Sequence, residues 1–148
     1  MTIDELLLTP YRVIDILPER VPENSPGQYS AVERYFLKDK ALRRRQAELL
    51  LKLNCYYDLT FVLPRPDGTE EEIFNPAPET VTKLVGREYL CVLIGGEVPG
   101  APEALITADR ADAYMTVYHA EGRLLDLIHK LTEAAGLFLW EEEREEDR

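Results

Sequence analysis

Residues that commonly do chemistry are scarce in this sequence. It holds two histidines, His119 and His129, and two cysteines, Cys55 and Cys91. A nucleophilic triad needs a base beside its nucleophile, and neither cysteine lies near a glycine-rich elbow or a helix start that would activate a thiol. Both cysteines sit in apolar stretches with the pattern of strands, where a thiol behaves as a small hydrophobic side chain. The sequence therefore favours a protein that is not an enzyme.

One polar cluster is a candidate for a metal site or a catalytic site. His119 ends an expected strand and Glu121 follows it, while Asp109 and Asp112 lie in the turn before that strand. A metal ion needs three or four ligands that converge from different elements. These four residues meet only if the turn and the following helix start come together. A solvated set of loop residues is the simpler interpretation, and the sequence predicts no metal and no cofactor.

Tyrosine is the most frequent aromatic residue, with eight copies against four phenylalanines and one tryptophan. Tyrosines lie at core edges with the hydroxyl in water, or they anchor a binding partner. Alternation along two expected strands would place the side chains of Tyr56, Thr60, Tyr114, Thr116 and Tyr118 on one sheet face, with acidic residues around them. The predicted binding residues are Tyr56, Asp58, Thr60, Glu70, Glu71, Glu72, Tyr114, Thr116 and Tyr118.

Charge is divided unevenly along the chain. Residues 1–54 contain 9 Lys or Arg against 8 Asp or Glu, whereas residues 55–148 contain 8 against 20. The net charge of −11 opposes general binding to nucleic-acid phosphates. Six basic residues gather on one expected helix but fan over several of its faces, so we interpret them as a solvated surface. They are Lys38, Lys40, Arg43, Arg44, Arg45 and Lys52.

The hydrophobic pattern predicts an α+β fold, a mostly antiparallel sheet with one long helix and two shorter helices packed on it. The long helix spans residues 30–53. It begins with a capping-box pair, Ser30 and Glu33, and has a second start at Asp39 that allows a kink. A first capping box, Thr2 and Glu5, predicts a short helix near the N-terminus. The shorter helices are expected at 79–85 and 121–135, and the strands at 11–17, 55–63, 69–74, 88–94, 104–107, 113–119 and 137–140.

The chain length and apolar runs set the domain organisation and the compartment. We expect one globular domain over residues 1–140 and an acidic frayed tail over residues 141–148. The apolar runs are much shorter than the about 20 residues of a spanning helix. The N-terminus also lacks the basic and apolar segments of a signal peptide. A soluble cytoplasmic protein without a membrane partner is therefore predicted.

The leading hypothesis is a small acidic, non-catalytic protein-binding module of the inhibitor, immunity-protein or nucleic-acid-mimic type. It would act through the acidic, tyrosine-bearing sheet face, because acidic surfaces occupy basic grooves and accelerate association. The expected partner is another protein with a basic surface, and nucleic acid is not expected. Two alternatives stay open. One is a small-ligand binder or metal-assisted enzyme with its site near Asp109, Asp112, His119 and Glu121, and the other is a homodimeric structural domain.

Overall fold

A computed structural model of the chain describes residues 1–95 and 101–141. It has seven antiparallel strands in one sheet and five helices, which confirms the expected α+β fold. The helices are α1 (Ile3–Leu6), α2 (Tyr29–Lys38), α3 (Lys40–Leu53), α4 (Pro78–Leu84) and α5 (Gly122–Ala134). The strands are β1 (Tyr11–Asp15), β2 (Leu59–Pro64), β3 (Glu70–Phe74), β4 (Leu90–Gly95), β5 (Pro102–Ala108), β6 (Met115–Tyr118) and β7 (Phe138–Glu141).

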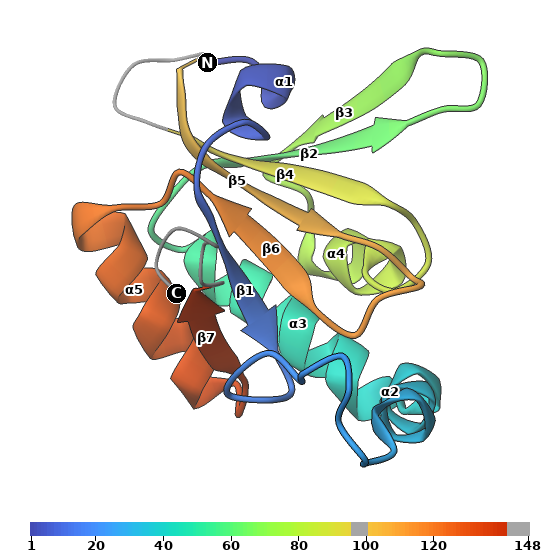
Figure 1. Cartoon of the computed structure of the whole chain (residues 1–148). Helices are drawn as coiled ribbons and strands as arrows, with labels where there is room; N and C mark the ends of the chain where they lie inside the picture. Colours follow the sequence, from blue (N-terminus) through green and yellow to red (C-terminus); the bar gives the residue numbers. More distant parts are fainter. Residues whose placement is uncertain (96–100, 142–148) are drawn as a thin grey trace.

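The sheet combines hairpins with one inserted strand. Its order is β3-β2-β4-β5-β6-β1-β7, and β1 lies between β6 and β7 (Figure 1). On one face of β1, Ile14 belongs to the main core beneath the helices. The expected tail begins one residue too early, because Glu141 is the last residue of β7. Residues 142–148 of that tail, and residues 96–100 of the loop expected after β4, lie outside the described residues.

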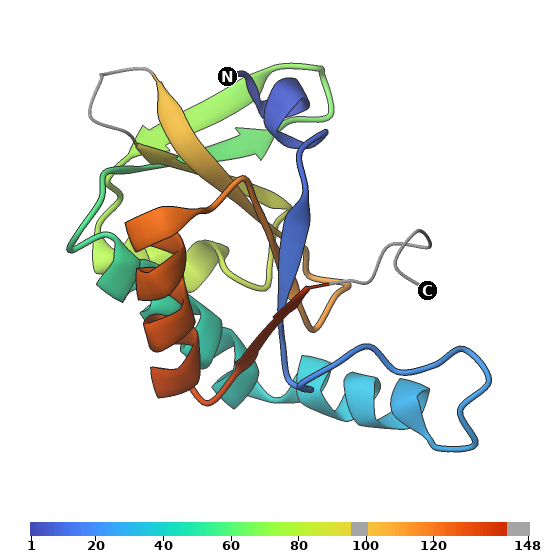
Figure 2. The same ribbon diagram turned by 60° about the vertical axis from the view of Figure 1, so that its left-hand side comes forward.

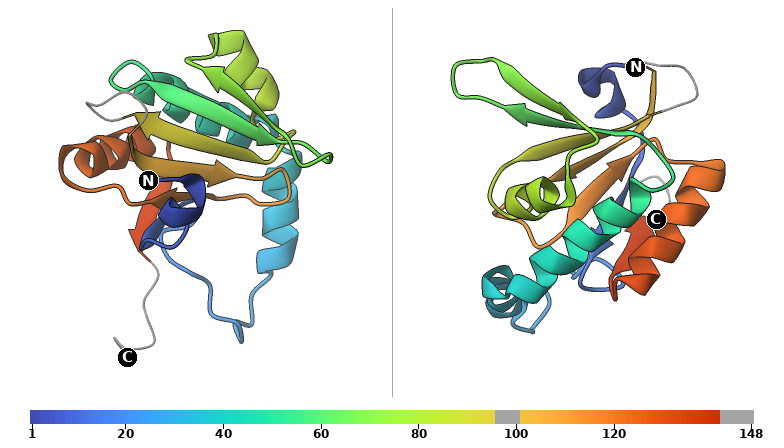
Figure 3. Two further views of the ribbon diagram at one scale, coloured as in Figure 1. Left: turned by 90° about the horizontal axis from the view of Figure 1, so that it is seen from above. Right: turned by 180° about the vertical axis from the view of Figure 1, so that it is seen from behind.

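Helices α3, α4 and α5 cover one face of the sheet (Figure 3, right). The apolar stripe expected on α3 is confirmed: Leu42, Leu49, Leu50 and Leu53 are buried against residues of the central strands, such as Phe61. In the described part of the chain, no helix is both long and apolar enough to cross a bilayer.

The long helix expected over residues 30–53 is divided at Asp39. The backbone of Asp39 is extended, and its carboxylate accepts the Ala41 N–H at 3.0 Å to cap α3, as the second start signal predicted. The capping box expected at Ser30 is wrong. Helix α2 begins at Tyr29, and its N-cap Gln28 makes no side-chain capping bond. Helix α2 therefore extends past the end of β1 as a separate segment (Figure 2).

A second, smaller core lies on the opposite face of the sheet, beneath α1. Leu6 is fully buried there against Val62, Cys91 and Leu105 of the central strands. Thr2 caps the helix by accepting the Glu5 N–H at 3.2 Å, which confirms the first capping-box pattern. Two packing layers therefore sandwich the middle of the sheet, although α1 covers only part of this second face.

The strand expected over residues 55–63 starts too early in the prediction. Residues 54–58 form a turn out of α3, in which the Asn54 side chain donates to the Tyr57 carbonyl at 3.0 Å, and β2 begins only at Leu59. Cys55 is consequently exposed and outside the sheet, a correction to the expectation that both cysteines lie in strands. Cys91 is buried in β4 as predicted.

Gly86 ends α4 in the left-handed conformation expected of a C′ residue, with φ +85°. We expect Gly86→Ala to lower the free energy of unfolding by more than the roughly 1–2 kcal/mol that this conformation costs an L-residue. The added Cβ would lie 2.8 Å from the Arg43 side chain, whose guanidinium donates to the carbonyls of Arg110 at 2.8 Å and Asp112 at 3.1 Å. Urea unfolding of Gly86→Ala and Gly68→Ala measures the difference, because Gly68 has φ +86° and open space around it. Equal losses would show that Arg43 moves aside freely.

Candidate functional site

A pocket of about 720 Å³ lies on the sheet face opposite α3 and α5. The residues that line it belong to β1, β6 and β7, to the turn before β6, to the loop between β1 and α2 and to the start of α2. Figure 2 shows the path of that loop from β1 to α2. Five of the residues that line it are aromatic, and we call it the tyrosine pocket. These aromatic residues are Tyr11, Tyr29, Tyr114, Tyr118 and Trp140.

Strand register explains why these side chains share one face. Residues that lie directly opposite in neighbouring strands point to the same side of a sheet. Tyr11 pairs with Tyr118, and their rings are 5.7 Å apart at an angle of 49°. Val13 pairs with Thr116 on one side and with Trp140 on the other. The side chains of alternate residues in β1 therefore form a continuous floor with those of β6 and β7.

Asp15 is the buried charged group of the tyrosine pocket. Its residue is only 6% exposed, and its Oδ1 accepts the Ile16 N–H at 2.7 Å. Burial raises the pKa of the Asp15 carboxyl above its ordinary value, and the nearby Glu33 carboxylate adds to the rise. Hydrogen bonds from backbone N–H groups oppose this increase without cancelling it. The carboxylate is therefore ionised only at a cost that an approaching positive charge would reduce.

Trp140 places a second polar group near this carboxylate. Its indole N–H lies close enough to Asp15 to act on the carboxyl in the direction that lowers its pKa, against the larger effect of burial. Nε1 is nevertheless buried, and no acceptor among the described residues forms a regular hydrogen bond with it. Because an indole N–H can only donate, this atom would satisfy an acceptor on a molecule held in the pocket.

Phenol groups surround the carboxylates on the α2 side. The Tyr29 hydroxyl donates to the Glu33 carboxylate at 2.9 Å. Burial, followed by this hydrogen bond, raises the pKa of Tyr29 above its ordinary value, so the phenol stays protonated. Burial and three nearby carboxylates, those of Asp112, Glu33 and Asp15, raise the pKa of Tyr114 as well. The electrostatic environment of this side of the pocket is therefore negative.

Three of the predicted binding residues meet in the tyrosine pocket: Tyr114, Thr116 and Tyr118. Thr60 lies on the same sheet face and in the same cross-strand row as Tyr118, but Leu93 and Leu105 stand between them. Both leucines belong to the small core beneath α1. Helix α1 therefore divides the predicted face and separates Thr60 from the pocket.

Two further predicted residues, Tyr56 and Asp58, lie in the turn between α3 and β2. They line a separate hollow of about 340 Å³, together with Gly95 and Glu103. The side chain of Asn75 stabilises this turn. Its amide N–H donates to the Asp58 carboxylate at 3.0 Å, and its oxygen accepts the Leu59 N–H at 2.9 Å. The tyrosine pair at 56 and 57 is thus part of a turn, not of a strand face.

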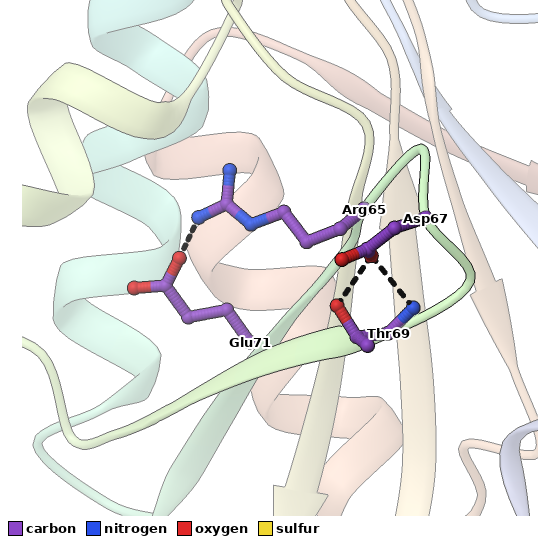
Figure 4. Close-up of polar contacts among 4 residues, drawn as sticks. All are labelled: Arg65, Asp67, Thr69 and Glu71. Atoms are coloured by element: carbon purple, nitrogen blue, oxygen red, sulfur yellow. Dashed lines mark hydrogen bonds and ion pairs between the residues drawn. The ribbon is translucent and has the colours of Figure 1, made fainter.

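The three predicted glutamates of β3 lie at the far edge of the sheet, as their charge indicated. Glu71 forms an ion pair with Arg65 across the hairpin (Figure 4). The turn is closed by Asp67, which accepts the Thr69 hydroxyl at 2.6 Å and its N–H at 3.0 Å (Figure 4). Three strands, β4, β5 and β6, lie between the β3–β2 hairpin and the strands β1 and β7 of the pocket floor. These acids therefore contribute charge to the molecule but do not line the pocket.

The alternative polar cluster does not come together. Asp109 and Asp112 precede β6, whereas His119 and Glu121 follow its other end. His119 instead lies with Nδ1 2.8 Å from the Glu103 carbonyl. In residues 1–95 and 101–141, no group of three or more His, Cys, Asp or Glu residues is arranged to hold a metal ion.

The sequence reasoning missed Asp15, Tyr29 and Trp140 as site residues. A signal for Asp15 was present, because an aspartate within the apolar run Val13–Leu17 is unusual for an interior strand. No comparable signal marks Tyr29 or Trp140. Their role depends on the path of the loop after β1 and on the pairing of β7 with β1.

The chain was compared with family models, curated proteins and solved structures, and none of them matches it. The functional argument therefore depends on the geometry and chemistry of the tyrosine pocket.

Proposed function

We propose that this chain is a non-catalytic binding protein that holds a segment of another protein in the tyrosine pocket. One observation carries the proposal. The predicted face residues Tyr114, Thr116 and Tyr118 line a pocket of about 720 Å³ with the buried carboxylate of Asp15 in its wall. Ligand sites commonly measure roughly 300–1,000 Å³ and combine apolar walls with a few placed polar groups.

The shape of the rim supports a chain segment as the occupant. The rim residues Pro22, Glu23 and Ser25 are exposed, so the pocket is open along the loop after β1. The volume is larger than any single amino-acid side chain, which leaves room for neighbouring residues of a bound segment. Tyrosine and tryptophan side chains provide large rigid contact areas, which is why they recur as anchors of protein interfaces.

The charge of the chain supports a basic partner. With a net charge of −11, the protein attracts basic surfaces at long range and accelerates their association at low salt. Glu72 lies on the same sheet face as the pocket, since it pairs with Val62 of the α1 core. A partner seated on this face would therefore meet further negative charge at the β3 edge.

A displayed library of random peptides, selected on the immobilised protein, tests the proposal. We expect enriched peptides to bind wild type and Tyr35→Ala equally. They should bind Tyr11→Ala at least about tenfold more weakly, because Tyr11 lines the pocket and Tyr35 does not. Tyr35 is a matched control, as it is 67% exposed on α2 outside the pocket. Affinities measured by calorimetry at two salt concentrations give the electrostatic part. A library without enriched sequences, or equal losses in both variants, would overturn the proposal.

A further inference from the structure

The walls of the tyrosine pocket have the chemistry that favours an organic cation. Aromatic ring faces carry partial negative charge and attract ammonium or guanidinium groups. Tyr11 and Tyr118 are in ring contact at 5.7 Å, and Trp140 lies across β1 from Thr116, beside them on the same face. An anionic occupant would face these rings and the carboxylates behind them, and would be repelled.

The charged groups near the pocket, like its aromatic rings, favour a positively charged occupant. Asp15, Glu33 and Asp112 lie near enough to act on the phenol of Tyr114. Of the residues that line the pocket, only Arg20 is basic, and its guanidinium lies 3.9 Å from Glu23, also a lining residue. The carboxylate of Asp15 is thus buried in surroundings that are already negative. A cation placed beside the Asp15 carboxylate would offset the repulsion between it and the neighbouring carboxylates.

We propose that the tyrosine pocket binds an arginine side chain of a partner protein, with the guanidinium against Asp15 and the aromatic walls. This inference rests on the proposed function and specifies the group recognised. Arginine fits better than lysine because a planar guanidinium stacks on aromatic rings and donates several hydrogen bonds in one plane to a carboxylate. The unpartnered indole N–H of Trp140 then donates to a carbonyl of the bound segment.

The protein contains its own probe for this test. Trp140 is the only tryptophan in the chain and lines the pocket, so selective tryptophan emission reports on occupancy. We titrate wild type with an acetylated and amidated Gly-Arg-Gly peptide and with the same peptide carrying citrulline, a neutral isostere of arginine. We expect a saturable change with arginine and at least about tenfold weaker binding with citrulline, because the charge-assisted bonds to Asp15 are lost.

Variants assign the selectivity to one carboxylate. In Asp15→Asn we expect most of the preference for the arginine peptide over the citrulline peptide to be lost, and the aromatic walls and neighbouring carboxylates to account for what is left. Asp126→Asn removes the same charge from an exposed site on α5, on the other side of the sheet, and should keep the full preference for arginine. The comparison of the two peptides on wild type needs no variant and tests the inference even if one variant folds poorly.

The other possible outcomes of the titrations each overturn a stated part of the inference. Equal binding of arginine and citrulline peptides to wild type, or no saturable change with either, overturns the inference. A lysine peptide or tetramethylammonium that binds as tightly as the arginine peptide would overturn the choice of arginine. The two proposals fail separately. Enriched library peptides without arginine leave the protein-binding proposal intact, whereas binding of tetramethylammonium with no enriched peptide would overturn it.

Discussion

Leu6→Ala is expected to lower the free energy of unfolding by about 2–5 kcal/mol, the range for emptying a well-packed leucine site. Leu6 is fully buried and is the main anchor of α1 in the core with Val62, Cys91 and Leu105, against which Ile3 also packs in part. Helix α1 has four residues, too few to be stable alone. Because the remaining contact of α1 with this core is the partly buried Ile3, loss of the Leu6 side chain should detach the helix as well as leave a cavity. Urea unfolding of both proteins measures the loss.

Thiol reactivity distinguishes a detached helix from a cavity beneath a docked one. In a Cys55→Ser background, Cys91 is the only thiol, and burial beneath α1 raises its pKa and excludes reagents. We expect Cys91 to react slowly in this background and much faster once Leu6→Ala is added. Leu8→Ala is the matched control, because Leu8 is 88% exposed just after the same helix. If Leu6→Ala leaves both stability and Cys91 reactivity unchanged, α1 does not cover the sheet.

Local signals predicted the elements that are fixed by local physics. The α3 stripe, the Asp39 break and the Gly86 helix end each depend on residues a few positions apart, and each was confirmed. The start of β2 was misplaced because Cys55 and Tyr57 continue its alternating pattern, although Asn54 and Asn75 hold that segment in a turn. Asn75 is 21 residues from Asn54 in the chain, so no local pattern contains the contact.

The pocket was predictable only in its β6 portion. Alternation predicted a shared face for Tyr114, Thr116 and Tyr118, and all three line the pocket, Tyr114 from the residue just before β6. The rest of the floor depends on sheet order, which places β1 beside β6 and β7 beyond β1, although β1 and β7 come from opposite ends of the chain. The same sheet order moves the acidic β3 away from the tyrosines.

Asp15→Asn is expected to make the unliganded protein more stable at neutral pH. The pKa of this carboxyl is higher in the folded protein than its ordinary 3.8, so the folded state holds the proton more tightly than the unfolded state. Wild-type stability therefore falls as the pH rises from about 3.8 through the raised pKa. Asparagine has no charge to bury and keeps an oxygen for the Ile16 N–H. The groups that face Asp15 in wild type are Tyr29, Glu33, Tyr114 and Trp140.

Urea unfolding of wild type and Asp15→Asn across this pH range measures the difference. The difference in unfolding free energy should be largest above the raised pKa of Asp15. It should vanish below the ordinary pKa, where Asp15 is protonated in both the folded and the unfolded state. Asp126→Asn controls for the loss of one negative charge from an acidic chain, since its site is exposed.

Addition of the arginine peptide should stabilise wild type and leave Asp15→Asn nearly unchanged, because only the carboxylate gains a counter-charge. A variant that is less stable than wild type at neutral pH would show that the Asp15 charge supports the fold. A buried charge that lowers stability indicates a functional role, because binding then accounts for its presence. A charge that raises stability gives no such indication, and the main argument for a ligand in the tyrosine pocket would be lost.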